Sequence, residues 1–395
     1  MKRTFSFDGP SALVLSGTAL VAVTYGLVRL AYGLFLPDVQ AELGLDDATA
    51  GLISSAASAL YCLGALAGFL LAATRPRLLV VLAAVTAGGG AAGTALGGDV
   101  ATFGVAAVVS SAGAGLASPA LVALVRRGVD AAGEGRAQAV VNSGTGPGLA
   151  LAGLLALLLL PEWRTAWAVA AVAAGVAAAA VLLSDRRTAP RAAGQGRQES
   201  RPARARQALP PRTWFAQHGT VVLAAGLLGA GSAAVWTYGR TLLVASGATP
   251  TVSVVAWIAL GLGGASVAAT ARWTSRLRPG AAWAVTVGAV AVATLSLAAA
   301  PQASVLALAA CVVFGWGYTA ATGALIAWTT DLDPGRAAPG TSMLFVVLVL
   351  GQALGAAGAG ALVGTVGLPV TFAVAAAVTA AGVAVTVPRS RRARA

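Results

Sequence analysis

The sequence predicts an all-α membrane protein with twelve transmembrane helices in two pseudo-symmetric six-helix bundles. Of its 395 residues, 58% are hydrophobic and only 10% are charged, whereas soluble domains are about 25% charged. Twelve apolar stretches are each long enough to cross a bilayer, which takes about 20 residues. An arginine-rich stretch divides them into six and six. This composition excludes a soluble enzyme, a disordered chain and a nucleic-acid-binding domain.

The first half of the chain, residues 1–183, predicts the N-terminal bundle. Its apolar stretches are 11–36, 48–73, 78–98, 100–125, 137–160 and 165–183. Proline, glycine and charged residues punctuate the short breaks, as at Pro37-Asp38, Arg75-Pro76-Arg77 and Pro161-Glu162. The first apolar run is too long for a cleavable signal peptide, so we expect it to be a membrane span.

Residues 184–218 predict a flexible, solvated linker, because they hold eight arginines with prolines and lack apolar periodicity. We expect His218, the only histidine of the sequence, to be a solvated residue at the membrane edge. Residues 219–395 predict the C-terminal bundle with a short basic tail. Its apolar stretches are 219–245, 250–271, 280–299, 303–329, 340–364 and 368–387.

The basic residues are distributed unevenly among the predicted loops. With the N-terminus inside, 23 of the 26 Lys and Arg fall in the termini, the linker and the cytoplasmic loops, and only Arg164 falls in an outer loop. By the positive-inside rule this predicts a multi-pass protein of the cytoplasmic membrane with both termini cytoplasmic. The net charge of +13 therefore has a topological explanation, and contact of the basic linker with anionic lipid is the alternative.

The two halves contain matching segments. Gly135-Arg136-Ala137 opens the fifth stretch, and Gly335-Arg336-Ala337 opens the eleventh stretch 200 residues later. A second match joins the first and seventh stretches, because Tyr25 lies four residues before Arg29 and Trp236 lies four before Arg240. Repeated halves of this kind are a common transporter design, with the substrate between them near the midplane of the bilayer.

Local motifs accompany these repeats. They are the segment from Gly68 to Arg77, the basic loop Ala271–Arg278, Gly144-Thr145-Gly146-Pro147-Gly148 in the fifth stretch, and Glu162-Trp163-Arg164 before the sixth. Together with the two halves of six stretches, they resemble the major facilitator superfamily of bacterial type. The chain departs from the family pattern in one respect, because the acidic residue of the two basic loops is absent and Ser275 stands at one of its positions.

The resemblance implies a secondary transporter that moves a small solute across the cytoplasmic membrane by alternating access. We expect a monomer in the lipid bilayer, with a small-molecule substrate and no nucleic-acid partner. The runner-up interpretation is a proton-coupled antiporter that exports drugs or metabolites, which the Gly-Pro segment of the fifth stretch suggests.

Arg29 and Arg240 are the most informative residues, because a charge in mid-span costs about 2.5–3.5 kcal/mol on insertion scales. They lie about 12 Å and about 10 Å below the outer ends of their spans, at about 1.5 Å per residue. No Asp or Glu lies inside the predicted spans, so an anionic substrate is a natural partner for both guanidiniums. The alternatives are snorkelling to the headgroups, bonding to backbone carbonyls, or pairing of one arginine with Asp38.

Other side chains complete the predicted site. Tyr25, Tyr32, Trp236 and Tyr238 are expected to shape the pocket, and further cavity candidates are Tyr61, Trp257, Trp316, Tyr318 and Gln352. Asp38 is the nearest acid and a candidate for proton coupling. Gly144, Gly146, Pro147, Gly351 and Gly355 are candidates for close helix packing or gating.

Chemistry other than transport finds no support in the sequence. Cys62 and Cys311 are isolated in apolar stretches, and His218 has no neighbouring acid or cysteine cluster, so no metal site or cofactor is expected. No nucleophile lies beside a base, and no Walker-type sequence is present, which argues against an enzyme or an ATP-driven pump. An intramembrane enzyme or a non-transporting sensor is therefore the least favoured hypothesis.

Overall fold

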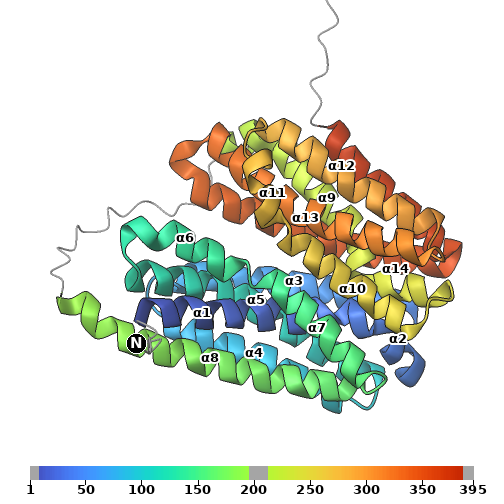
Figure 1. The fold of residues 1–395 in the computed structure, drawn as a ribbon, viewed down its shortest axis with the longest axis horizontal. Helices are drawn as coiled ribbons and strands as arrows, with labels where there is room; N and C mark the ends of the chain where they lie inside the picture. The colour runs from blue at the N-terminus through green and yellow to red at the C-terminus, as the bar shows by residue number, and fades with distance from the viewer. Residues whose placement is uncertain (1–8, 195–211, 386–395) are drawn as a thin grey trace, which may run out of the picture.

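The computed structural model describes residues 9–194 and 212–385, and within these residues helices are the only regular secondary structure. The first half contains α1 (Gly9–Val21), η1 (Ala22–Arg29), α2 (Ala31–Leu43), α3 (Asp47–Leu71), α4 (Pro76–Leu96), α5 (Val100–Gly128), α6 (Ala131–Asn142), α7 (Thr145–Leu159) and α8 (Trp163–Gly194). The second half contains α9 (Arg212–Ala245), α10 (Pro250–Ala265), α11 (Val267–Thr274), α12 (Pro279–Ala299), α13 (Ser304–Leu332), η2 (Pro334–Arg336) and α14 (Ala337–Ala384) (Figure 1).

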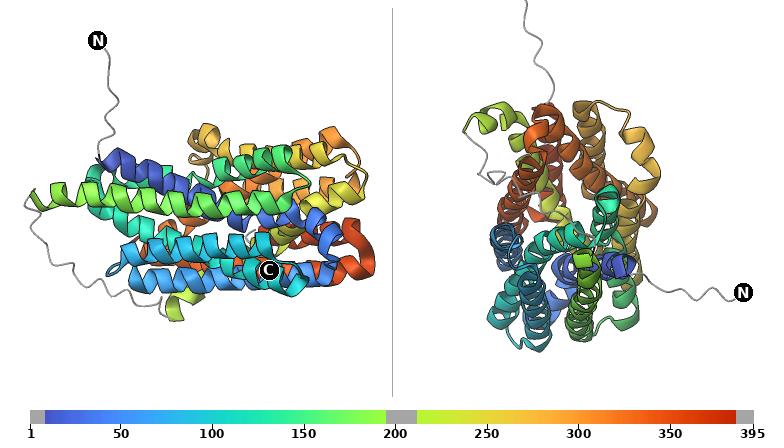
Figure 2. Two further views of the ribbon diagram at one scale, coloured as in Figure 1. Left: turned by 90° about the horizontal axis from the view of Figure 1, so that it is seen from below. Right: turned by 90° about the vertical axis from the view of Figure 1, so that its left-hand side faces the viewer.

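The helices form two bundles that lie side by side, one from each half of the chain (Figures 1 and 2). Within the described residues, 11 helical segments are long and apolar enough to cross a membrane. The last of them, Pro339–Ala384, is interrupted at Gly367, where φ is +79°. Glycine tolerates this left-handed backbone, and Pro369 cannot continue the helix hydrogen bonding. Division at Gly367 gives twelve spans, which confirms the predicted fold.

The first span is irregular in its middle part. Between α1 and α2 it passes through the π-helical segment η1, at whose end the Leu30 N–H donates to Tyr25 O at 2.8 Å. The predicted end of this span at residue 36 is wrong, because Pro37 lies inside α2 and the helix continues to Leu43. Asp38 is therefore part of a membrane-spanning helix and not of a loop. π-helical turns of this kind are frequent at functional sites.

Aspartates cap the first turns of α3 and α5. Asp46 accepts a hydrogen bond from the Thr49 N–H at 2.8 Å, and Asp99 accepts from Ala101 and Thr102 at the start of α5. Such caps satisfy amide groups that have no partner within the helix. Hydrogen bonds from the Thr49 and Thr102 amides lower the pKa of both carboxyl groups.

The predicted boundaries of the linker, 184–218, are wrong at both ends. Helix α8 continues to Gly194 and α9 begins at Arg212, so helix extends into both ends of the predicted linker; residues 195–211 lie outside the described residues. Asp185 is buried, and His218 is also buried rather than solvated, with its ring stacked on Trp214 at 3.8 Å. The high arginine content led to the prediction of a linker, although helix with buried residues continues into both ends of the predicted segment.

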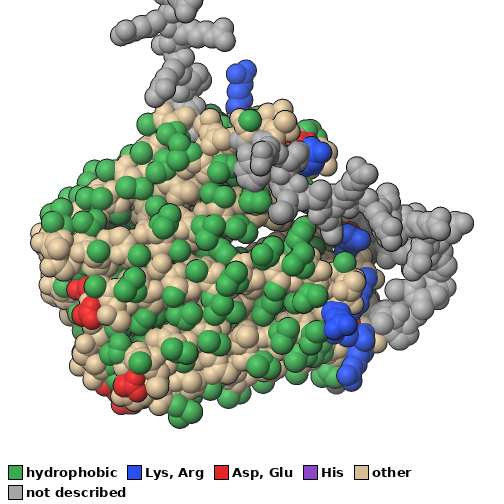
Figure 3. All heavy atoms as spheres, turned by 180° about the vertical axis from the view of Figure 1, so that it is seen from behind, with side chains coloured by type: hydrophobic (Ala, Val, Ile, Leu, Met, Phe, Trp, Pro, Cys, Tyr) green, Lys and Arg blue, Asp and Glu red, His purple; other side chains and the backbone are tan. Residues whose placement is uncertain are grey.

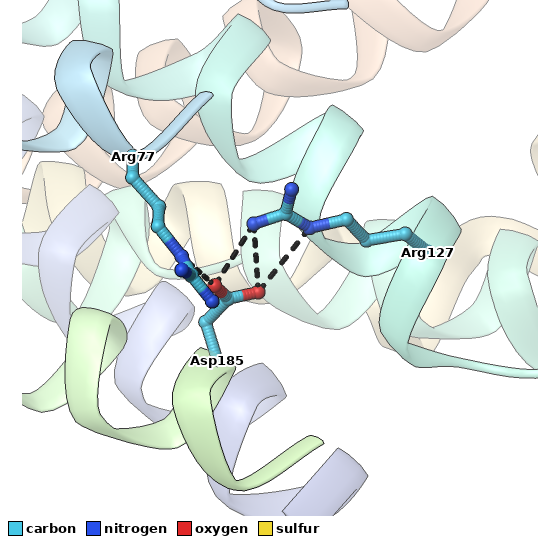
Figure 4. Close-up of polar contacts among 3 residues, drawn as sticks. All are labelled: Arg77, Arg127 and Asp185. Atoms are coloured by element: carbon cyan, nitrogen blue, oxygen red, sulfur yellow. Dashed lines mark hydrogen bonds and ion pairs between the residues drawn. The ribbon is translucent and has the colours of Figure 1, made fainter. Parts of the chain in front are cut away.

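A buried carboxylate joins three helices of the N-terminal bundle. Arg77 at the start of α4 and Arg127 at the end of α5 both point to Asp185 of α8, with N–O distances of 2.5 and 2.8 Å (Figure 4). The side chain of Asp185 is 3% exposed, while the two arginines are about half exposed. The acid that is absent from the basic loop is therefore supplied from the sixth span, within the same bundle.

Glycines bring the helices of each bundle into close contact in a symmetric manner. In the fifth span, a Cβ atom added at Gly148 would lie 2.3 Å from Ala22 O of the first span. In the eleventh, a Cβ at Gly355 would lie 2.1 Å from Ala230 O of the seventh. Gly144 and Gly351 make similar approaches, Gly146 faces α10, and Pro147 lies in the first turn of α7. Gly144, Gly148, Gly351 and Gly355 thus sit where only hydrogen fits, whereas a Cβ at Gly146 would make ordinary contacts.

The charges separate toward the two ends of the molecule. On the face seen in Figure 3, most Asp and Glu side chains lie at one end and most arginines at the other, with acidic atoms also beside the arginines and a mainly apolar surface between the two ends. We call these the acidic end and the arginine end. The arginine end includes Arg75, Arg77, Arg126, Arg127, Arg186 and Arg187. An apolar belt between two polar ends is the surface that a lipid bilayer requires.

Candidate functional site

A cavity of about 440 Å³ lies between the two bundles. Its lining comes from spans 1, 2 and 4 of one bundle and spans 7 and 11 of the other. The lining residues are Arg29, Leu30, Tyr32, Ser54, Ala57, Ser58, Ser111, Ala233, Trp236, Thr237 and Gln352. Many of these residues have short side chains, and most of the surface that they present to the cavity is apolar. The lining includes no Asp or Glu, and its single charge is on Arg29. Such a cavity favours ligands with acceptor groups over cations.

Arg29 lies at the end of the π-helical segment η1, which turns its side chain to the cavity. One terminal nitrogen, Nη2, donates to Gln352 Oε1 at 3.0 Å, and the guanidinium carbon lies 4.6 Å from the centroid of the Tyr61 ring. Its Nε has no hydrogen-bond partner, and no ion pair is formed by Arg29 among the described residues. The guanidinium is thus fixed by neutral groups and its charge is not compensated.

Tyrosines hold the arginine from the side of the N-terminal bundle. The hydroxyl groups of Tyr25 and Tyr61 are 2.8 Å apart, and Tyr25 also bonds to Ser118 at 3.0 Å. Neither ring lines the cavity, which corrects the prediction that Tyr25 and Tyr61 form its wall. Tyr61 instead contacts the Arg29 guanidinium with its ring, and Tyr25 bonds to the hydroxyl of Tyr61.

An aromatic cluster lies on the opposite side of the cavity, in the C-terminal bundle. The Trp236 ring makes edge contacts with Tyr318, Phe314 and Trp257 at centroid distances of 5.2, 5.6 and 6.2 Å. Gln352 donates to the Tyr318 hydroxyl at 2.9 Å while it accepts from Arg29. Gln352 therefore connects the charge of one bundle with the aromatic cluster of the other.

Arg240 has a different environment from Arg29. Its side chain is only 2% exposed, forms an ion pair with Asp38, and donates to Leu34 O at 2.7 Å and to Ser253 at 3.1 Å. It does not line the cavity. The prediction that the two arginines lie at equal depth is wrong, because Arg240 meets the first span at Leu34 and Asp38, well beyond Arg29. Asp38 reaches it because the helix does not end at Pro37.

Comparison with known proteins identifies the family. The family model described as Major Facilitator Superfamily matches residues 18–347. This chain belongs to the major facilitator superfamily. No curated protein matches the sequence.

Solved structures of superfamily transporters share the fold. The nucleoside transporter NupG aligns with a TM-score of 0.74 at 13% identity, over 96% of this chain and 98% of that chain. The D-xylose-proton symporter gives 0.73 at 15% identity, over 98% of both chains. A bacterial homologue of the human lysosomal transporter Spinster, in an inward-facing and unoccupied conformation, gives 0.69 at 15% identity, over 97% and 95%. As a member of the superfamily with many apolar helices, the chain is a multi-pass secondary transporter of a small-molecule substrate.

In this superfamily member, the bundles are joined at the acidic end. Besides the Asp38–Arg240 pair, Tyr238 donates to Asp47 O at 2.5 Å, and the hydroxyls of Ser54 and Thr237 are 2.9 Å apart. On the face seen in Figure 3, the surface is hollowed between the bundles toward the arginine end. The polar contacts between the bundles thus close the cavity toward the acidic end.

The remaining predicted residues are divided between cavity and interface. Tyr32, Trp236 and Gln352 line the cavity. Tyr238 is buried in the contact between the bundles, and Trp316 lies away from the lining and donates to Thr270 at 2.8 Å. The sequence did not point to the small hydroxyl residues of the lining, which are Ser54, Ser58, Ser111 and Thr237. Nothing in the sequence distinguishes them from other Ser and Thr of apolar helices, which bond to their own backbone.

Proposed function

We propose that this transporter moves a small organic anion by alternating access, and that Arg29 holds the anionic group. The supporting observation is the uncompensated guanidinium of Arg29 in the cavity between the bundles. A charge inside the membrane is costly and usually marks a substrate or ion pathway. A carboxylate or phosphate would supply the missing charge through short, charge-assisted hydrogen bonds.

The proposal includes a route for the substrate and an orientation in the membrane. The cavity is closed toward the acidic end, so substrate would enter or leave this conformation through the arginine end. By the positive-inside rule the arginine end would face the cytoplasm, in the cytoplasmic membrane, with both termini on that side. The protein would function as a monomer, because a single chain supplies both halves of the site.

Asp38 is our candidate for coupling transport to protons. Its carboxylate forms the ion pair with Arg240 that joins the bundles at the acidic end. Protonation of Asp38 would remove one charge of this pair and weaken the closure, so a proton from outside would favour opening. Asp38→Asn is therefore expected to lose the dependence of anion uptake on an imposed pH gradient.

The alternative, proton-coupled export of drugs or metabolites, has no comparable observation in its favour. The lining of the cavity lacks an acidic side chain and carries the positive charge of Arg29. A cationic ligand would meet repulsion there, because the site is partly shielded from water.

Counterflow of labelled anions in proteoliposomes tests the proposal. With panels of carboxylates, phosphates and organic cations, wild-type protein should exchange an anion, and Arg29→Gln should reduce this exchange at least about 100-fold because a charge-assisted contact is lost. Arg336→Gln is the matched control, since Arg336 is exposed and forms only a weak pair at 3.5 Å with Asp333. Exchange of a cation by the wild type, or unchanged anion exchange by Arg29→Gln, would contradict the proposal.

A further inference from the structure

Three polar atoms on residues that line the cavity have no hydrogen-bond partner among the described residues. They are Arg29 Nε, Ser111 Oγ and Trp236 Nε1. Buried polar atoms without a partner are rare in folded proteins, because each loses its hydrogen bonds to water without replacement. Ser111 is the clearest case, since it is 1% exposed and its neighbour Ser110 satisfies its own hydroxyl on Ala107 O at 2.7 Å. Other buried side chains of the described residues also lack a partner, but these three atoms are on residues that border one cavity, where a ligand with acceptor groups would satisfy them.

The chemistry of these atoms defines the polar part of that ligand. Arginine Nε–H and tryptophan Nε1–H can only donate, and a serine hydroxyl can donate as well. Most other polar groups of the lining are already engaged, because Ser54 bonds to Thr237, Tyr32 donates to Ala50 O and Gln352 bonds to Arg29. The cavity therefore offers donors next to a positive charge. A carboxylate, which is a pure acceptor with two oxygens, satisfies this arrangement.

The apolar part of the lining indicates the body of the ligand. The rings of Tyr32 and Trp236 border the cavity together with the small side chains Ala57 and Ala233. Aromatic walls suit an aromatic ring, because rings pair favourably in offset or edge contacts.

We infer that the substrate is a small aromatic monocarboxylate, and that Ser111 and Trp236 donate hydrogen bonds to it beside Arg29. This inference rests on the proposed anion transport through Arg29 and adds its substrate class and two specificity residues. Arg29 and Ser111 belong to the N-terminal bundle and Trp236 to the C-terminal bundle. The bound acid therefore links the bundles, and its binding favours their closure around it.

Calorimetric titration of the purified full-length protein in detergent tests the substrate class. Benzoate is the probe, benzamide keeps the ring without the charge, acetate keeps the carboxylate without the ring, and benzylamine reverses the charge. Benzoate should bind at least about tenfold more tightly than each of the other three, because only benzoate satisfies both the donors and the aromatic walls. Equal or tighter binding of benzamide or acetate would overturn the assignment of an aromatic carboxylate.

Single substitutions test the two donors. Ser111→Ala and Trp236→Phe remove a donor while keeping most of the shape, and each should weaken benzoate binding about tenfold, the effect of losing a hydrogen bond to a charged group. Ser110→Ala and Trp167→Phe are the matched controls: Ser110 and Trp167 do not line the cavity, and Trp167 Nε1 also lacks a hydrogen-bond partner among the described residues. Both controls should bind benzoate like the wild type.

Thermal unfolding of the ligand-free protein separates binding from a structural role. Ser111→Ala should melt at the same temperature as the wild type or higher, since it removes a hydroxyl that has no partner. A lower melting temperature, or unchanged benzoate affinity of both donor variants, would overturn the inference. If Arg29→Gln alone then abolished anion exchange, the proposed function would remain while the donor assignment failed. If the wild type exchanged no anion, both would fail.

Discussion

Arg29 and Arg240 lie in matching positions of the two repeats but have opposite surroundings. Arg240 is neutralised by Asp38 and buried in the contact between bundles, whereas Arg29 is supported by Tyr61 and Gln352 and keeps its charge available. The same sequence spacing thus accompanies two different roles, Arg240 in the closure of the acidic end and Arg29 in the proposed binding of the ligand. The difference arises from Asp38, one turn of helix beyond Leu34.

At the same scale, the ion pair of Asp38 and Arg240 predicts a strong and non-additive effect on stability. Asp38→Ala should destabilise the protein by about 3–5 kcal/mol, because it leaves a buried guanidinium without its counter-charge. Arg240→Met combined with Asp38→Ala should recover part of this loss, since the double variant contains no buried charge at the pair. Thermal unfolding in detergent measures both.

The control for this pair is the exposed one at Asp333. Asp333→Ala should change the stability by only about 0–1 kcal/mol, because solvent screens its contact with Arg336. Equal melting temperatures for Asp38→Ala and Asp333→Ala would contradict a buried ion pair between the bundles.

The helices are positioned by close contacts at glycine. The fifth span packs on the first and the eleventh on the seventh, and in both cases the backbones approach so closely that a methyl group would not fit. These contacts hold η1 with Arg29 on one side of the cavity and α14 with Gln352 on the other. The positions of the polar residues therefore depend on glycines that never touch the cavity, such as Gly148 and Gly355.

At the scale of the element, Gly355→Ala is expected to be far more damaging than Gly358→Ala in the same helix. A Cβ at Gly355 would lie 2.1 Å from Ala230 O, while a Cβ at Gly358 meets nothing within 4 Å. Overpacking of a closely packed interior typically costs about 1–3 kcal/mol, and alanine at an open helical position is neutral or stabilising. Melting temperatures of the two variants check this, and equal values would argue against the close contact.

The two bundles must rock about the cavity if the protein alternates its access. The acidic end is closed by polar contacts that join the first, second, seventh and eighth spans, among them Ser54–Thr237 and Tyr238–Asp47. Each of these contacts links the two bundles, except the bond from Arg240 to Ser253, which orients Arg240 within the C-terminal bundle. Opening toward the acidic end therefore requires them to break together.

At the scale of the whole molecule, a disulfide across the acidic end should arrest transport. Ser54→Cys with Thr237→Cys, in a background with Cys62→Ala and Cys311→Ala, would join positions whose hydroxyl oxygens are 2.9 Å apart. Oxidation should abolish counterflow and reduction should restore it. Each single cysteine variant is the control, and continued transport by the cross-linked protein would show that these contacts need not separate.

How much the sequence predicted depends on the kind of signal. The twelve spans and Arg29 were found because apolar length and an isolated charge are visible in a single chain. The contacts of Arg240, Asp185 and His218 were not, because Pro37-Asp38 had the features of a loop and arginine-rich composition had those of a linker. Ser111 gave no signal, since its significance lies in a missing hydrogen bond that only three-dimensional packing reveals.

The interruption of α14 has a mechanical consequence. The eleventh and twelfth spans are joined through a single non-helical residue, Gly367, with no loop to absorb motion between them. The eleventh span carries Gln352 at the cavity. The twelfth span carries exposed apolar residues, such as Val370 and Val374, on the face that would contact lipid. The two spans are therefore mechanically coupled, so a change in the tilt of one span changes the position of the other. Changes in bilayer thickness or lateral pressure that tilt the twelfth span would thereby change the shape of the cavity.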